Sequence, residues 1–221
     1  MSIKIENIVT LNEEQLRSVI MGARNPMNSW DRSDTSGVDI GDADLNLLKR
    51  LRKAGTDHRK YLRMIPVWMD ITAPLYWFKE ADTYKVGTVA NSCSTMLKIH
   101  SKEFTMDDFS CDKLKKCSDI MPCIISELNL LRESYINYDS YVEEMIGFGL
   151  EGEELPSKKE LWYSMIQLLP SSYNQKRTVF LNFEVLLNMY HARKNHKLDE
   201  WQEFCKTIEQ IPLFKELCLE D

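Results

Sequence analysis

The chain has 221 residues with 43% hydrophobic side chains and a formal net charge of −6. That length allows a substantial core without help from disulfides or metals. The acidic balance, with a pI near 5.4, argues against sequence-independent nucleic-acid binding. No apolar run approaches a membrane span, and the first residues lack the apolar core of a signal peptide. We therefore expect a cytoplasmic protein with neither nucleic acid nor membrane as partner.

The six cysteines do not form a metal-binding pattern. None belongs to a C-x-x-C pair, and no histidine lies at zinc-finger spacing from two of them. In a reducing compartment they are expected to be free thiols, and we predict no metal site. Only Cys93 lies among small polar residues, so it is the one thiol considered for chemistry.

The N-terminal quarter is predicted to contain a strand and two helices. Residues 3–9 are β-branched and alternate like a strand. Thr10 or Asn12 then caps an amphipathic helix, and residues 42–53 form a second one. Between them, residues 25–41 are rich in Pro, Asn, Ser, Asp and Gly and read as a long surface loop. Trp30 and Arg32 in this loop either close over a ligand or pin the loop to the body.

The middle of the chain reads as strand, helix and polar loop. Residues 62–71 are predicted as a strand, which Pro66 places at an edge or marks with a bulge. Pro74 then leads into a helix that runs to about Lys85. The following loop, residues 85–95, combines one lysine with hydroxyls, a thiol and Gly87. It suits a phosphate or nucleotide edge, or else a turn that caps its own backbone.

The C-terminal half is predicted to be helical. Helices are expected from Ser118 or Asp119 to about Ile146, then over 157–168, 176–193 and 199–210, with an acidic loop at 151–154 and a tail from Ile211. Neither a repeat nor a linker is evident, so residues 1–221 are predicted to form a single domain. The fold class expected is α+β, an antiparallel-rich mixed sheet flanked by helices, with a helix-rich C-terminal half. Rossmann, P-loop, zincin and nucleophile-elbow motifs are missing.

Three stretches in the same order resemble the flavin-dependent thymidylate synthases. The first is G-T-D-H-R-K-Y-L-R-M followed by I-T-A-P, within residues 55–74. The second is the predicted helix and loop of residues 74–96, where the family's Arg-His-Arg signature falls on Thr83, Tyr84 and Lys85 and its serine on Cys93. The third covers residues 169–196, with a Leu-Pro start, a basic pair, two asparagines and an arginine. Trp201 beyond it matches with a one-residue shift.

The resemblance implies an α+β homotetramer that uses FAD, with NADPH and methylenetetrahydrofolate, to methylate dUMP in sites between subunits. It assigns catalytic roles to Lys85 and Cys93. The residues that it assigns to the cofactor are His58, Thr83, Tyr84, Asn182 and Asn188. The residues that it assigns to the pyrimidine nucleotide are Ser92, Ser94, Lys176, Arg177 and Arg193.

The sequence departs from the family at the signature itself. Two arginines and a histidine are replaced, and only Lys85 keeps a positive charge, without the bidentate fork of arginine. The Glu-His pair of the first stretch is replaced by Arg63 and Met64. The arginine that follows the late tryptophan in the family has no counterpart near Phe204.

Three functions therefore stay open at this point. The first is a divergent flavin-dependent thymidylate synthase-like enzyme for dUMP or a related pyrimidine nucleotide. The second is a module on the same scaffold that binds a nucleotide, to sequester or sense it, without turnover. The third is a structural oligomer with a degenerate site. Retention of flavin separates the first from the other two.

Overall fold

The computed structural model describes residues 3–117, 119–150 and 155–220. The chain falls into two compact units. The sheet unit comprises residues 3–72, 77–91 and 176–220, and the helical unit comprises 73–76 and the described residues of 92–175. Each unit is assembled from separated stretches of the chain, so the boundary between the units does not correspond to a linker in the sequence.

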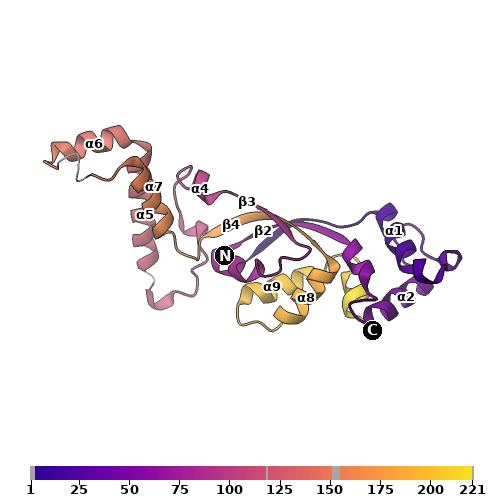
Figure 1. Ribbon diagram of the computed structural model, residues 1–221. Helices are drawn as coiled ribbons and strands as arrows, with labels where there is room; N and C mark the ends of the chain where they lie inside the picture. Colours follow the sequence, from indigo (N-terminus) through magenta and orange to yellow (C-terminus); the bar gives the residue numbers. More distant parts are fainter. Residues whose placement is uncertain (1–2, 118, 151–154, 221) are drawn as a thin grey trace. The chain divides into compact units, whose positions relative to one another are not determined.

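One antiparallel sheet organises the described strands (Figure 1). Its strands are β1 (Lys4–Val9), β2 (Pro66–Pro74), β3 (Val89–Ser92) and β4 (Asn174–Asn182), in the spatial order β1-β2-β4-β3. Strand β1 pairs with β2 antiparallel, with Ile5 opposite Ile71, and its register shifts after Glu6. The predicted α+β class and antiparallel-rich sheet are confirmed, and most helical residues lie in the second half of the chain.

Strand β4 corrects the helix predicted over residues 176–193. Only Phe183–Arg193 is helical, as α8, and Asn182 both ends the strand and caps that helix. Within the strand, buried Val179 and Leu181 alternate with exposed Lys176 and Thr178, a period of two. Val179 also lies four residues before the helical core residue Phe183, which is helical spacing, so the apolar pattern alone fits both structures.

The neighbouring elements differ from expectation in three ways. Pro66 is the first residue of β2, an interior strand, and not an edge residue. A proline fits there because the first residue of a strand can lack a ladder hydrogen bond. Helix α3 covers only Leu75–Ala81 and stops short of Lys85. The predicted loop 85–95 contains strand β3, which its small polar residues concealed.

The two predicted N-terminal helices and the long loop between them are confirmed. Helix α1 (Glu13–Arg24) begins at Asn12, whose side chain forms a capping box with Gln15. Helix α2 (Asp42–Lys53) follows the long loop, which contains two single 3₁₀ turns, Asn25–Met27 and Trp30–Arg32. The indole N–H of Trp30 donates to Asn25 Oδ1 at 2.8 Å, so Trp30 links two parts of the loop.

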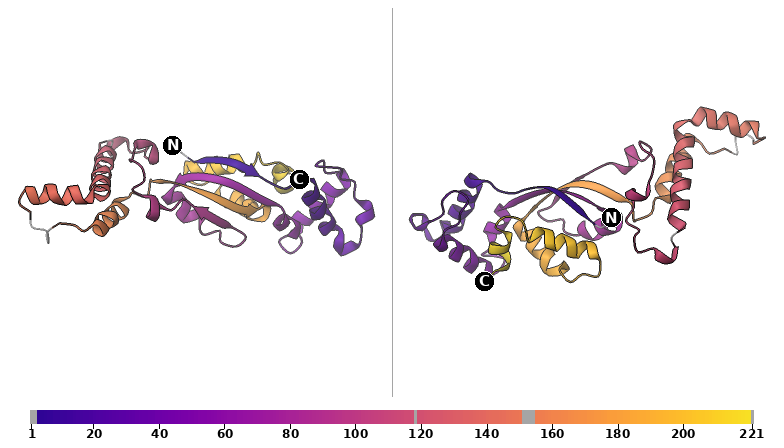
Figure 2. Two further views of the ribbon diagram at one scale, coloured as in Figure 1. Left: turned by 90° about the horizontal axis from the view of Figure 1, so that it is seen from above. Right: turned by 180° about the vertical axis from the view of Figure 1, so that it is seen from behind.

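An aromatic layer covers one face of the sheet. Helices α8 and α9 (Asp199–Ile208) lie along that face in both views (Figures 1 and 2). The Trp77 ring of α3 packs 4.6 Å from that of Trp201 and 5.6 Å from that of Phe204. The predicted tail after Ile211 belongs to this core, because Phe214 is fully buried against Phe183.

The helical unit has its own core. It contains α4 (Thr95–Lys98), α5 (Ile120–Ile136), α6 (Tyr138–Gly147) and α7 (Lys158–Leu168), and α5 packs along α7. The single helix predicted to Ile146 breaks at Asn137, whose ψ of 42° is not helical. The acidic loop predicted at 151–154 lies outside the described residues. The buried core residues are Ile99, Phe104, Phe109, Met121, Ile125, Leu128 and Met165.

Asp70 joins three strands on the other face of the sheet. Its carboxylate accepts hydrogen bonds from Thr178 Oγ1 at 2.6 Å and Asn7 Nδ2 at 2.9 Å, and Lys176 Nζ lies 3.0 Å away. These donors, Thr178 first, lower the pKa of Asp70 from 3.8 to about 2. The ionised form of Asp70 therefore stabilises the pairing of β1, β2 and β4.

The contribution of Asp70 to stability should depend on pH. Because the folded pKa lies below the unfolded value, the stabilisation is complete above about pH 4 and is lost as the pH falls toward about 2. We expect urea unfolding to show wild type more stable than Asp70→Asn at about pH 5, with the gap narrowing as the pH falls. A gap that does not change with pH would contradict this assignment.

Candidate functional site

The α3–β3 loop, residues 82–88, carries the three positions where the signature was predicted. The Thr83 hydroxyl donates to the Glu80 carbonyl at 2.7 Å and so helps to end α3. Tyr84 is half-buried, whereas Lys85 is exposed. Within the described part of the chain, no ion pair holds the Lys85 ammonium. This loop therefore offers solvent one cation, at the position where the resemblance places the last signature residue.

Glu80 ties this loop to helices α8 and α9. Its Oε2 lies 2.8 Å from Trp201 Nε1, 3.0 Å from Arg193 Nη1 and 3.3 Å from His196 Nε2. Arg193 also donates from Nε to the Tyr84 hydroxyl at 3.0 Å. The structure thus brings Tyr84 and Arg193 together, and both already have partners within the chain.

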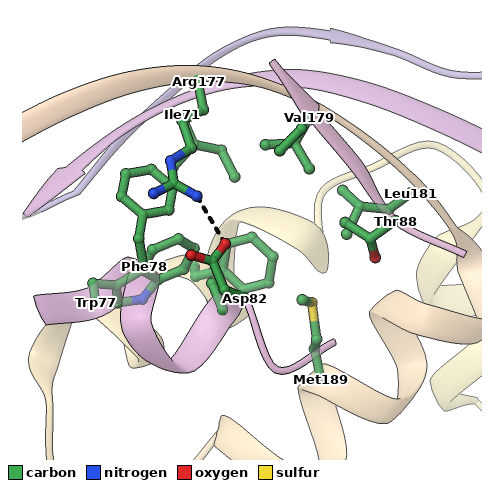
Figure 3. Close-up of a pocket in the computed structure, with 12 residues that line it drawn as sticks. Ile71, Trp77, Phe78, Asp82, Thr88, Arg177, Val179, Leu181 and Met189 are labelled. Atoms are coloured by element: carbon green, nitrogen blue, oxygen red, sulfur yellow. Dashed lines mark hydrogen bonds and ion pairs between the residues drawn. The ribbon is translucent and has the colours of Figure 1, made fainter. Parts of the chain in front are cut away.

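Arg177 lies beside the same loop, on the covered face of β4. Its guanidinium stacks 3.9 Å above the Phe78 ring and its Nη1 pairs with Asp82 Oδ1 at 2.7 Å (Figure 3). The side chain of Arg177 is 16% exposed and that of Asp82 is 55% exposed. The pair stands at one side of a cavity under the sheet.

That cavity is small and almost wholly apolar. It measures about 30 Å³, room for about one or two water molecules. Its walls come from all three of β2, β3 and β4, together with α3, α8 and α9. Two buried polar atoms on its lining residues, Trp77 Nε1 and Thr88 Oγ1, have no hydrogen-bond partner among the described residues. The chemistry of the cavity fits a small polar occupant such as water, but not a nucleotide or a flavin ring.

Gly87 and Asn182 fix the conformation of the loop. Asn182 is buried, and its Oδ1 accepts the Val185 N–H at 3.1 Å as the cap of α8. Gly87 has a φ of +79°, and a Cβ there would lie 2.9 Å from Asn182 Nδ2. The Asn182 side chain therefore supports the loop from inside.

A second group of predicted residues gathers around Arg59. Arg59 donates to Glu184 Oε1 from Nε at 3.1 Å and from Nη2 at 2.9 Å, and a longer bond of 3.4 Å reaches Asn188 Oδ1. His58 precedes Arg59 in an exposed turn, and Asn188 is exposed as well. His58 and Asn188 therefore lie on one accessible patch with Arg59 between them.

The remaining predicted residues lie elsewhere. Lys176 follows the alternation of β4 to the face opposite Arg177, where it pairs with Asp70. Ser92, Cys93 and Ser94 belong to the helical unit. The Cys93 thiol is exposed, and the Cys93 carbonyl accepts from Gln175 Nε2 at 2.9 Å. Ser94 caps α4 through the Leu97 N–H, so the capping interpretation of this segment holds for that residue.

Metal ligands, membrane-spanning helices and reactive thiols were also considered among the described residues. No group of histidine, cysteine or acidic side chains there could hold a metal, and no described helix has the length and apolar character to cross a bilayer. Burial raises the pKa of the Cys205 thiol to about 11 and that of Cys218 to about 12, so both remain protonated. Glu80 and Asp82, which hold Arg193 and Arg177, carry no sequence signal beyond their charge.

Replacement of Gly87 by alanine tests whether the loop is held as described. An alanine would need a left-handed backbone and would crowd Asn182, so Gly87→Ala should lower the free energy of unfolding by about 1–3 kcal/mol. Chemical denaturation measures this change. Gly147→Ala is the matched control, because nothing lies within 4 Å of a Cβ at that position. Equal effects of the two replacements would refute a special role for Gly87.

Comparison with known proteins places the fold. No family model matches the sequence, and no curated protein matches it. A solved structure does match, that of the flavin-dependent thymidylate synthase ThyX from Helicobacter pylori complexed with FAD and dUMP. The TM-score is 0.65 at 15% identity, over 100% of both chains. A second structure of that enzyme with FAD and dUMP gives 0.67 at 15% identity, over 99% of this chain and 98% of the other. The chain therefore has the fold of the flavin-dependent thymidylate synthases along its whole length.

Proposed function

We propose that this protein is a divergent flavin-dependent enzyme that reductively methylates dUMP or a related pyrimidine nucleotide. The supporting observation is the end-to-end likeness to an enzyme solved with FAD and dUMP, in which no region of either chain is left over. A fold alone does not fix a reaction. The second support is Lys85, an exposed cation at the position where the resemblance places the last signature residue.

The residues available to a flavin lie on the surface of the sheet unit. The cavity beneath the sheet is far too small for a tricyclic ring. The exposed patch around Arg59 fits better, because His58 and Asn188 offer an imidazole and an amide there. We propose that this patch holds part of FAD and that a second subunit completes the site, within a homotetramer. When bound, FAD supplies redox chemistry, with NADPH and methylenetetrahydrofolate as co-substrates.

Lys85 is proposed to stabilise negative charge on the pyrimidine or its phosphate. A cation beside the ligand can act in this way because positive charge lowers the free energy of a developing anion. Loss of one such donor typically costs about two to three orders of magnitude in rate, so a site with one lysine in place of three signature residues should be slow. Tyr84 and Thr83 are proposed to shape the loop through their bonds to Arg193 and to the end of α3.

Nucleotide binding without turnover is the second candidate, and one specific observation favours it. Three other cations predicted for the nucleotide each pair with a carboxylate of this chain: Lys176 with Asp70, Arg177 with Asp82 and Arg193 with Glu80. These pairs lower the positive charge left for a transition state. They leave Lys85 able to hold a ground-state nucleotide.

The visible spectrum of the purified protein, loaded with FAD and desalted, tests the proposal. We expect a retained flavin band that shifts when dUMP is added, and oxidation of NADPH that depends on the nucleotide. A colourless protein would end the enzyme proposal. A protein that binds nucleotide but neither retains flavin nor oxidises NADPH would support binding without turnover.

Lys85→Ala should weaken nucleotide binding. Loss of a hydrogen bond from a charged donor typically corresponds to about tenfold or more in affinity. Calorimetric titration with dUMP measures the loss. Lys206→Ala is the control, since Lys206 is an exposed lysine on α9 that pairs with nearby Glu203. An unchanged dissociation constant in Lys85→Ala would remove Lys85 from the site.

A further inference from the structure

The sheet unit also contains a hollow that is lined by arginines. It is formed by the end of α1, the two 3₁₀ turns and the outer side of α2. Its arginines are Arg24, Arg32 and Arg50, and Asp31 is its one acidic lining residue. No residue of the α3–β3 loop lines it, so it is separate from the site proposed above.

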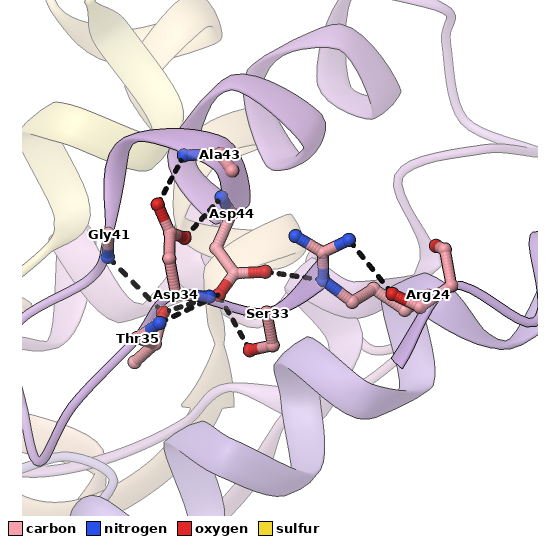
Figure 4. A network of polar contacts seen from close by, with 8 residues as sticks. Arg24, Ser33, Asp34, Thr35, Gly41, Ala43 and Asp44 are labelled. Atoms are coloured by element: carbon pink, nitrogen blue, oxygen red, sulfur yellow. Dashed lines mark hydrogen bonds and ion pairs between the residues drawn. The ribbon is translucent and has the colours of Figure 1, made fainter. Parts of the chain in front are cut away.

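Arg24 is a buried, firmly held member of this group. Its side chain is only 4% exposed. Its Nε donates to Asp44 Oδ1 at 2.6 Å, and its Nη1 donates to the Ser29 carbonyl at 3.1 Å (Figure 4). Burial of an ion pair costs free energy unless both partners are well hydrogen-bonded, so the surroundings of this pair matter.

Asp44 is fully engaged by the loop that precedes α2. Its Oδ2 accepts hydrogen bonds from the Ser33 hydroxyl at 2.8 Å and from the Thr35 hydroxyl at 2.7 Å, and the Asp34 and Thr35 backbone N–H groups also donate to it. Burial opposes ionisation, but these bonds outweigh it and hold the pKa of Asp44 below its usual value. Asp44 therefore stays charged and fixes the Arg24 guanidinium in place.

One donor of Arg24 is left over. Its Nη2 is buried and has no hydrogen-bond partner among the described residues. Buried charged donors are nearly always satisfied. Asp44 Oδ1 already accepts from Arg24 Nε, and Asp44 Oδ2 accepts from the loop before α2. Because Arg24 lines the hollow, an acceptor bound there would satisfy these unused N–H groups.

The rest of the hollow favours an anion as that acceptor. Arg32 and Arg50 are exposed, and neither forms an ion pair with another described residue. The lining of the hollow thus contains two such guanidinium groups and one carboxylate, that of Asp31. Arginine binds phosphate in a planar two-pronged geometry. The Asn28 amide and Ser29 hydroxyl add polar groups, while Leu47 and Leu51 supply an apolar wall.

We propose that this hollow binds the phosphate group of a small organic molecule, with Arg24 as the fixed donor and Arg32 and Arg50 closing on the anion. The apolar wall from α2 suits the carbon skeleton of such a ligand. Because Arg32 and Arg50 are exposed and Arg24 is buried in a network, the first two can be replaced without disturbing the fold.

Calorimetric titration of the full chain with inorganic pyrophosphate tests this site. We expect binding by wild type, a loss of about tenfold or more in Arg32→Gln/Arg50→Gln, and steep weakening by salt. Arg17→Gln, an exposed arginine of α1 outside the hollow, should bind as wild type does. Circular dichroism and the melting temperature establish that each variant is folded.

Lys85→Ala separates this site from the proposed nucleotide site. Unchanged pyrophosphate affinity in that variant, together with the loss in the double arginine variant, supports the hollow. Loss of binding in Lys85→Ala would assign the anion to the other site and overturn the inference. Absence of binding by wild type at millimolar pyrophosphate, or wild-type affinity in the double variant, would also overturn it.

Discussion

The alternation of side chains along β4 is the constraint on which the sheet unit depends. Val179 and Leu181 face the aromatic layer of Trp77, Trp201 and Phe204, and Arg177 shares that face. Lys176 and Thr178 face the other way and meet Asp70. A shift of one residue would exchange the two sets, burying a lysine and exposing the core. The same packing that stabilises β4 therefore decides which basic residue can lie beside the α3–β3 loop.

Ion pairs between distant segments then determine how much of the positive charge near the α3–β3 loop is left for a ligand. Glu80 lies on α3, yet it meets the end of α8 through Arg193 and the start of α9 through Trp201. Asp82 similarly meets Arg177 of β4 at one side of the cavity. These carboxylates stabilise the packing of helices on the sheet, and they also neutralise two of the basic residues proposed for the nucleotide.

The sequence predicted the elements whose signals are local. Asn12 at the start of α1 and Ser157 at the start of α7 have capping boxes that fix those helices from a few adjacent residues. It did not predict β4, because a short apolar pattern fits both helix and strand, and pairing with distant strands decides between them. It did not predict β3, because the small polar residues of that strand are typical of a loop. For the candidate site, the sequence supplied the residue types, such as Arg177 and Arg193. Their carboxylate partners could not be inferred, because those contacts exist only in the folded chain.

Arg177 and Arg193, the two arginines beside the α3–β3 loop, differ in how readily their ion pairs with carboxylates can be broken. The carboxylate of Asp82 is 55% exposed, so water can solvate it when it leaves Arg177, whose own side chain is 16% exposed. An incoming phosphate could replace Asp82 on Arg177 at small cost, while the stack on Phe78 keeps the guanidinium in place. Arg193 also bonds to Tyr84, and its partner Glu80 bonds to the buried Trp201. Release of Arg193 would break its ion pair with Glu80 and its hydrogen bond from Nε to Tyr84 together, so the energetics favour Arg177, with Lys85, as the pair that the proposed nucleotide would recruit.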